Sequence, residues 1–305
     1  MGSERGQSTV EWVGMLSLVS LLLVGVLAMG VRVPGTALAD SIFEKLLCAV
    51  SMAGSCGDEP HLIAAYGTEV GKLADDHMPS LLFEKGSRAL PVNFRRCRDT
   101  ACADGPQRGL VRRSHRGLPV AAFVHVIDCR PGKADSAEVD CSGDRAGNLY
   151  VQYWTYYANS ATLRGVPIVG RKGFHEDDWE SVQIRVRPDG SVDQRASSHH
   201  GYNYAKGISN AGSDTGIGPL KDIAELVGAR ARNGWGPETR LLLVSGGSHA
   251  GNSWGPADLS RVTPGDAVHL IPLEKIAAMG RDLKFAIGAP WLKHAWRDPE
   301  AEDAD

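Results

Sequence analysis

After residue 78 the chain alternates between short apolar runs and turns rich in Gly, Pro, Asp or Asn. Runs of β-branched and aromatic residues predict strands. They are Leu81–Phe83, Val120–Ile127, Leu149–Tyr157, Trp179–Val186, Ser191–Ser198, Leu241–Ser245 and Ala267–Ile271. Two other segments, Leu220–Ala231 and Leu273–Met279, have a helical pattern. Many short strands favour a sandwich over a doubly wound sheet, so we predict a mainly β domain, a β-sandwich with helical insertions, over residues 78–297.

The segments on either side of this domain have different patterns. Residues 12–31 read WVGMLSLVSLLLVGVLAMGV, an uncharged stretch long enough to cross a bilayer core, so we predict one transmembrane helix. Residues 32–77 carry apolar positions at helical spacing and predict a short helical stalk, whose second helix begins at Pro60 and stops before Pro79. The acidic residues 298–305 predict a solvated, disordered tail.

Residues 1–11 form a polar leader in front of the apolar span. Its sequence RGQSTVE at 5–11 resembles the leader of tight-adherence (Flp and TadE) pilin-like proteins. The resemblance implies cleavage after Gly6 and a role for Glu11 in pairing with the new N-terminal amine of a neighbouring subunit. The chain has Trp12 where those pilins carry tyrosine, and it is far longer, so the resemblance implies a pilin-like anchor on a large domain. A secretory signal with a cleavage region near residues 37–39 is the alternative.

Composition narrows the class of protein. The chain has 305 residues, 43% of them apolar, and a net charge of -3 without any Lys/Arg-dense run, so a folded core is expected and nucleic acid is not an expected partner. Six cysteines fit an oxidising compartment, and their spacing lacks the paired C-x2-C sets of a structural zinc site. We hypothesise sequential disulfides, with other pairings open: Cys48 with Cys56, Cys97 with Cys102, and Cys129 with Cys141. Together with the apolar span, these features predict a single-pass protein of the cell membrane with its C-terminal domain outside.

Candidate chemistry is concentrated in GFHEDDWE at residues 173–180. Strand side chains alternate between faces, so Asp178 and Glu180 point to the same side as the apolar residues that follow them. Buried carboxylates are costly unless they are paired or bind a cation. His175, in the preceding loop, would add a nitrogen ligand to a divalent cation site that favours magnesium or calcium over zinc. The alternative is a solvated acidic turn with Trp179 in the core.

The spacing of His175, Asp178 and Glu180 around a tryptophan resembles the H-x-x-D-W-E region of the necrosis-inducing (Nep1-like) family. It is similar also to the H-E-G-D-W-E segment of the vacuolar-protein-sorting-associated family. The aromatic run at 150–159 and the G-S-H-A segment at 247–250 extend this resemblance over roughly residues 78–275. It implies a β-sandwich in which those three residues ligate a divalent metal. The chain keeps only the first histidine of the toxin motif, so cytolysis is not implied.

Further polar residues are candidate neighbours of this site. His199 and His200 are adjacent on a predicted strand and face opposite ways, so at most one of them can join it. His249 lies beside Ser248 in a glycine-rich loop, and its alternative role is a hydrogen bond to backbone alone.

Three functions follow from these patterns. The first is a surface recognition module in which a divalent cation orders a rim that binds a glycan, a lipid headgroup or an envelope polymer. The second is a hydrolase, because Gly246–Ala250 is a near miss to the G-x-S-x-G elbow and a metal-activated water is another route. The third is a minor subunit of a tight-adherence pilus or secretion system. Sequence alone does not decide whether the protein is an enzyme.

Overall fold

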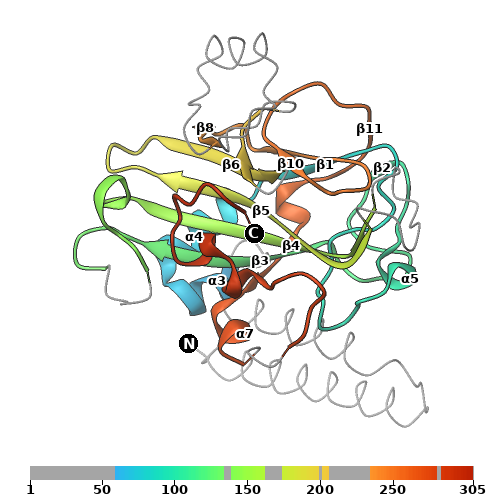
Figure 1. Cartoon of the computed structure of the whole chain (residues 1–305), viewed down its shortest axis with the longest axis horizontal. Coiled ribbons are helices and arrows are strands. Elements are labelled where there is room, and N and C mark those ends of the chain that lie inside the picture. The colour runs from blue at the N-terminus through green and yellow to red at the C-terminus, as the bar shows by residue number, and fades with distance from the viewer. Residues whose placement is uncertain are drawn as a thin grey trace, which may run out of the picture. The chain divides into compact units, whose positions relative to one another are not determined.

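The structure, a computed structural model, describes residues 59–133, 139–161, 174–198, 201–205, 234–279 and 283–304. This part of the chain is mainly β, as predicted, and forms two mixed sheets with few helices (Figure 1). The five-stranded sheet has the order β10-β9-β1-β11-β2. Its strands are β1 (Ser80–Glu84), β2 (Gly109–Leu110), β9 (Leu241–Val244), β10 (Gly251–Asn252) and β11 (Leu259–Thr263).

The seven-stranded sheet has the order β12-β3-β4-β5-β6-β7, with β8 paired to β6. Its strands are β3 (Ala121–Asp128), β4 (Leu149–Ser160), β5 (His175–Val186), β6 (Val192–Ser198), β7 (Gly201–Asn203), β8 (Gly236–Pro237) and β12 (His269–Pro272). The antiparallel pair β4–β5 is its longest, running from Leu149 opposite Val186 to Ser160 opposite His175. Each predicted strand run coincides with a strand. Those not predicted (β2, β7, β8, β10 and β11) are mostly too short to show an alternating pattern.

Helices are few. They are α3 (Glu59–Tyr66), α4 (Thr68–Asp76), α5 (Thr100–Ala103) and α7 (Glu274–Met279), with 3-10 turns η1 (Gly143–Arg145), η3 (Gly265–Ala267), η4 (Pro290–Leu292) and η5 (His294–Trp296). The helix predicted from Pro60 is two helices, because Gly67 takes a φ of 82° between them. Where α4 meets α3, a side chain on Gly71 would come within 2.6 Å of the Ile63 backbone nitrogen. The predicted helix at 273–279 is confirmed, and that at 220–231 lies outside the described residues.

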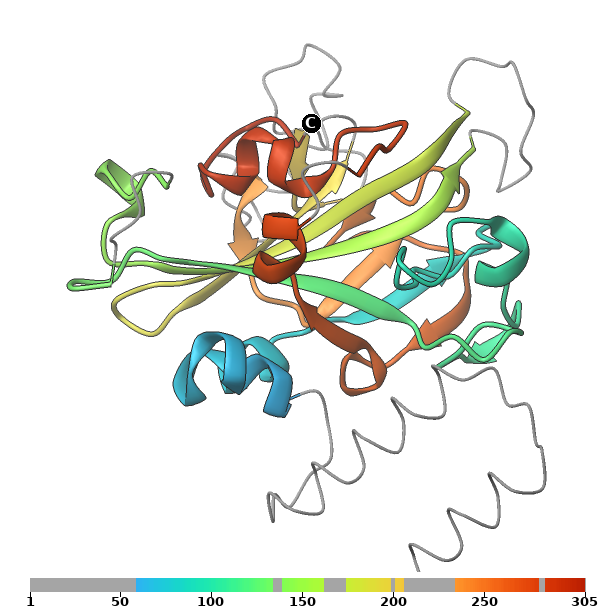
Figure 2. The same cartoon turned by 90° about the horizontal axis from the view of Figure 1, so that it is seen from below.

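The seven-stranded sheet is buried on both faces, which is why every residue of β4 is buried. One face packs with the five-stranded sheet and with α3 and α4 around an aliphatic core that includes Leu81, Val182 and Ile184. The other face carries an aromatic cluster that includes Phe123, Tyr156 and Trp179, and the C-terminal segment packs against it. Figure 2 shows this segment in red on one side of the sheet and α3 and α4 in blue on the other.

The C-terminal residues differ from the predicted solvated tail. Glu300 is only 8% exposed, and its carboxylate accepts hydrogen bonds from Tyr150, Arg185 and Trp235. A carboxylate can be buried when donors surround it.

Two of the hypothesised disulfides are present, Cys97–Cys102 and Cys129–Cys141, and they fit an exported domain. Cys48, Cys56, the leader with Gly6 and Glu11, and the predicted span at 12–31 lie outside the described residues. Among the described helices, none has the length and apolar character needed to cross a membrane.

Candidate functional site

The start of β5 brings Asp178 to the loop that follows β9. Oδ2 of Asp178 lies 2.9 Å from Nδ1 of His249, and the two residues are 6% and 3% exposed. The imidazole is stacked on Tyr157 with its ring plane 1° from parallel and 3.8 Å between the centroids. A carboxylate only accepts hydrogen bonds, so Nδ1 of His249 carries the hydrogen and Nε2 is the acceptor in the neutral ring. His249 is therefore not the backbone-bonded loop histidine of the alternative interpretation.

Glu180 lies on the same face of β5 as Asp178, as predicted from strand alternation. It accepts a hydrogen bond from the hydroxyl of Ser197 on β6, and that hydroxyl also accepts the Ser181 amide at 2.7 Å. Both carboxylates lie on the same side of the sheet as Tyr157 of β4, which is opposite Asp178. The pKa of Tyr157 is raised by burial and by the negative charges of Glu180 and Asp178. The acidic pair is thus part of the fold rather than a solvated turn.

The position of His175 differs from the predicted one. It is the first residue of β5 rather than part of a loop, and its odd separation from Asp178 directs the two side chains to opposite faces. Its Nδ1 lies 3.1 Å from the backbone oxygen of Asp177 instead. Within the described residues, no three His, Cys, Asp or Glu side chains lie close enough together to hold a metal ion. His175, Asp178 and Glu180 therefore do not form a three-ligand group among the described residues.

Asp177 is a buried acid that the sequence analysis did not single out. It accepts a hydrogen bond from Tyr156 at 2.6 Å, two from Arg98 at 3.2 and 2.7 Å, and one from the Ala286 amide at 2.9 Å. Burial alone would raise the pKa of Asp177, but the hydrogen bonds from Tyr156 and Arg98 hold it below its ordinary value. Asp177 thus ties the C-terminal segment to the start of β5. Its position in the acidic motif was the only signal for it.

Two residues at this end of the sheet have an unusual backbone conformation. Asp177 has a φ of 52° and His249 a φ of 58°, in the left-handed region that disfavours side chains. Asp177 precedes Asp178 in the sequence, and His249 lies within hydrogen-bond distance of Asp178. Backbone strain of this kind is concentrated at functional sites.

The serine elbow predicted as one hydrolase route is not formed. Ser248 is exposed, and β10 follows its loop at Gly251 where the elbow requires a helix. His199 and His200 lie outside the described residues.

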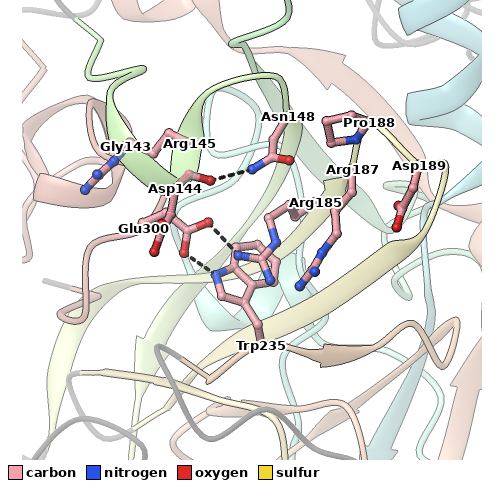
Figure 3. Close-up of a pocket in the computed structure, with 10 residues that line it drawn as sticks. All are labelled: Gly143, Asp144, Arg145, Asn148, Arg185, Arg187, Pro188, Asp189, Trp235 and Glu300. Atoms are coloured by element: carbon pink, nitrogen blue, oxygen red, sulfur yellow. Dashed lines mark hydrogen bonds and ion pairs between the residues drawn. The ribbon is translucent and has the colours of Figure 1, made fainter.

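A cavity of about 850 Å3 lies elsewhere on the seven-stranded sheet (Figure 3). Its lining comes from η1 and the loop before β4, from the end of β5 and the turn to β6, and from Trp235 and Glu300. Sequence reasoning missed it because its walls come from segments far apart in the chain, such as those of Asn148 and Glu300.

The fold defines the described part of the chain as a mainly β protein with two mixed sheets. It is similar to solved structures of NLPPya in complex with mannosamine and with glucosamine, each at a TM-score of 0.36 and 16% identity. A triple mutant of NLPPya matches at a TM-score of 0.37 and 14% identity. Each match covers 74% of this chain and 86% of the other. Similarity at this level assigns neither a family nor a function to the chain. No protein-family model and no curated protein matches it.

Proposed function

We propose that this chain is a membrane-anchored surface protein whose β domain recognises a hydroxyl-rich component, a glycan, lipid headgroup or envelope polymer. The recognising groups are Asp178, Glu180 and His249. The anchor is the apolar segment 12–31, and the two disulfides described above agree with an exported domain.

The buried pair of Asp178 and His249 is the observation that carries the proposal. A buried polar pair contributes little net stability compared with apolar residues of the same size. Positive φ angles at Asp177 and His249 add a cost of about 1 kcal/mol or more each. The buried polar pair and the positive φ angles are both unfavourable, and both occur around Asp178. A binding function at Asp178 would explain why the fold contains them. Carboxylate oxygens and the acceptor Nε2 suit the hydroxyl hydrogens of a polyol.

Recognition is tested by calorimetry of the full-length protein against a saccharide panel and phosphatidylglycerol vesicles. Binding that is lost in Asp178→Asn and His249→Gln supports the proposal. Glu176→Gln is the control, because Glu176 is an exposed acid on the same strand. Binding that survives in both site variants places recognition elsewhere.

A divalent cation at Asp178 and Glu180 is a separate part of the proposal. Magnesium or calcium would take oxygen ligands from the two carboxylates, and His175 would have to leave the backbone oxygen it now contacts. Elemental analysis and calorimetric metal titration of the wild type, Asp178→Ala and Glu180→Ala decide this. Equal metal binding in all three proteins would contradict a cation at Asp178 and Glu180. The proposal that the side chains themselves recognise the ligand would still stand.

Hydrolysis is the second candidate function. Asp178 holds His249 at 2.9 Å in the way that the acid of a catalytic triad orients its base, so Nε2 can take a proton from a water. Turnover of nitrophenyl ester and glycoside substrates that disappears in His249→Gln supports this function. Turnover absent from the wild type counts against it.

Membership of a tight-adherence pilus or secretion system depends on the leader alone. N-terminal sequencing of the membrane-extracted protein is expected to show cleavage after Gly6. An intact leader removes this assignment and leaves the recognition proposal standing.

A further inference from the structure

The cavity shown in Figure 3 is separate from the site at Asp178. Arg185, in its wall, follows Asp178 by seven residues on β5, which is about 23 Å along an extended strand. The loop before β4 and the turn between β5 and β6 form its sides. They lie close together: a side chain on Gly147 would come within 3.0 Å of the Pro188 ring. Its volume of about 850 Å3 is in the range of small-molecule sites.

The charges that line this cavity are balanced. Three arginines and three acids face it: Arg145, Arg185, Arg187, Asp144, Asp189 and Glu300. Asp193, which does not line the cavity, accepts hydrogen bonds from two of the arginines. Its Oδ2 lies 2.7 Å from Arg185 Nη2 and 2.7 Å from Arg187 Nε. A multiply charged anion or a polyamine would find no excess of opposite charge here. The balance favours a neutral ligand.

The walls of the cavity are already fixed. The guanidinium of Arg185 donates to Asp193 and to Glu300, and its central carbon lies 4.5 Å from the centre of the Trp235 ring. Glu300 in turn accepts from the indole of Trp235 at 2.7 Å. Burial opposes charge on Arg185, but Glu300 and Asp193 outweigh it and raise its pKa. A ligand therefore has few side chains to order on binding.

Hydrogen-bonding groups of both kinds remain unused. Asn148 is 6% exposed; its Nδ2 donates to the Asp144 backbone and to Tyr150, and its Oδ1 has no partner among the described residues. Arg187 uses Nε and Nη2 on Asp193, which leaves Nη1 without a described partner. On the same turn, Oδ1 of Asp189 accepts from Ser191, and Oδ2 has no partner in the described part of the chain. Free donors and free acceptors thus surround one space.

We propose that this cavity binds a neutral saccharide of one or two rings. Each sugar hydroxyl donates and accepts, so it matches a rim on which unused donors and acceptors stand close together. Asn148 Oδ1 receives a sugar hydroxyl, and Arg187 Nη1 donates to a sugar oxygen. The proposal goes beyond the function placed at Asp178, because the two sites share no residue.

The test uses the full-length protein, with cellobiose, maltose and N,N′-diacetylchitobiose as probes and with inorganic phosphate and putrescine as charged comparators. Binding is measured by calorimetry and by saturation-transfer NMR. At least one saccharide is expected to bind, about tenfold more weakly to Arg187→Ala and to Asn148→Ala. Arg112→Ala, which changes an exposed arginine elsewhere on the domain, should bind as the wild type does.

Three results overturn this proposal. They are the absence of saccharide binding to the wild type, binding of phosphate or putrescine in place of the sugars, and saccharide binding that Asp178→Asn abolishes while Arg187→Ala preserves it. The last result would support the function proposed at Asp178, so the two failures are distinguishable. If Asn148→Ala fails to fold, Asp189→Asn on the exposed turn provides the second variant.

Discussion

His249 and Asp178 meet across 71 residues of sequence, with Nδ1 of the histidine 2.9 Å from Oδ2 of the acid. The contact joins the loop after β9, in one sheet, to the start of β5, in the other. Stacking on Tyr157 fixes the orientation of the imidazole ring. The two sheets are therefore joined at this end by a polar contact as well as by the aliphatic core.

Replacing His249 by phenylalanine should reveal the energy of this pair. The variant keeps an aromatic ring on Tyr157 but leaves Asp178 buried without its partner, so we expect the free energy of unfolding to fall by about 3–5 kcal/mol. Adding Asp178→Asn to His249→Phe should recover part of that loss, because the unpaired charge is removed. Denaturant unfolding of the four proteins in this cycle measures the coupling. Strictly additive effects would show that the two side chains do not interact.

Glu300 should be the most sensitive acid of the C-terminal segment. Glu300→Gln removes a buried negative charge from Arg185, Tyr150 and Trp235, and we expect a loss of about 3 kcal/mol in the free energy of unfolding. Glu302→Gln is the matched control, because Glu302 is exposed and should change stability by less than about 0.5 kcal/mol. Similar values for both variants would contradict the role of Glu300 in holding this segment on the sheet.

The strands could be predicted where apolar residues recur over several positions, as in β4 and the second half of β5. The first half of β5 could not. His175 to Asp178 are polar residues that disfavour strands by propensity, and pairing with β4 overrides that preference. The prediction that His175 lies in a loop before the strand was therefore wrong, because β5 begins at His175.

The partners of the site residues were beyond prediction for a different reason. Periodicity reports which face a residue occupies, and it placed Asp178 and Glu180 on one face. It carries no information on which distant loop covers that face, so neither His249 beside Asp178 nor Arg98 beside Asp177 followed from the pattern. Glu300 was assigned to a solvated tail because its donors lie on β4, β5 and near β8.

Ionisation of Asp177 should make the free energy of unfolding decrease at acidic pH. Its pKa in the folded protein lies below the ordinary value of 3.8, so ionisation of Asp177 stabilises the fold at any pH above about 3.8. That contribution is lost as the pH falls from this value through the folded-state pKa. Asp177→Asn should therefore be less stable than the wild type at neutral pH, and the difference should shrink below about pH 4. Denaturant unfolding across this pH range measures it. A difference that is constant with pH would rule out ionisation of Asp177 as the cause.

The two described disulfides should differ in their contribution to stability. Cys129–Cys141 spans 12 residues and Cys97–Cys102 spans 5, and the longer loop has more chain entropy in the unfolded state. We expect Cys129→Ser with Cys141→Ser to lower the free energy of unfolding by about 3 kcal/mol, and the other pair to cost about 0.8 kcal/mol less. Thermal and denaturant unfolding of both double variants gives the comparison. The reverse order would mean that the Cys97–Cys102 bridge acts through the folded state, where it brackets Arg98 and so fixes the guanidinium that binds Asp177.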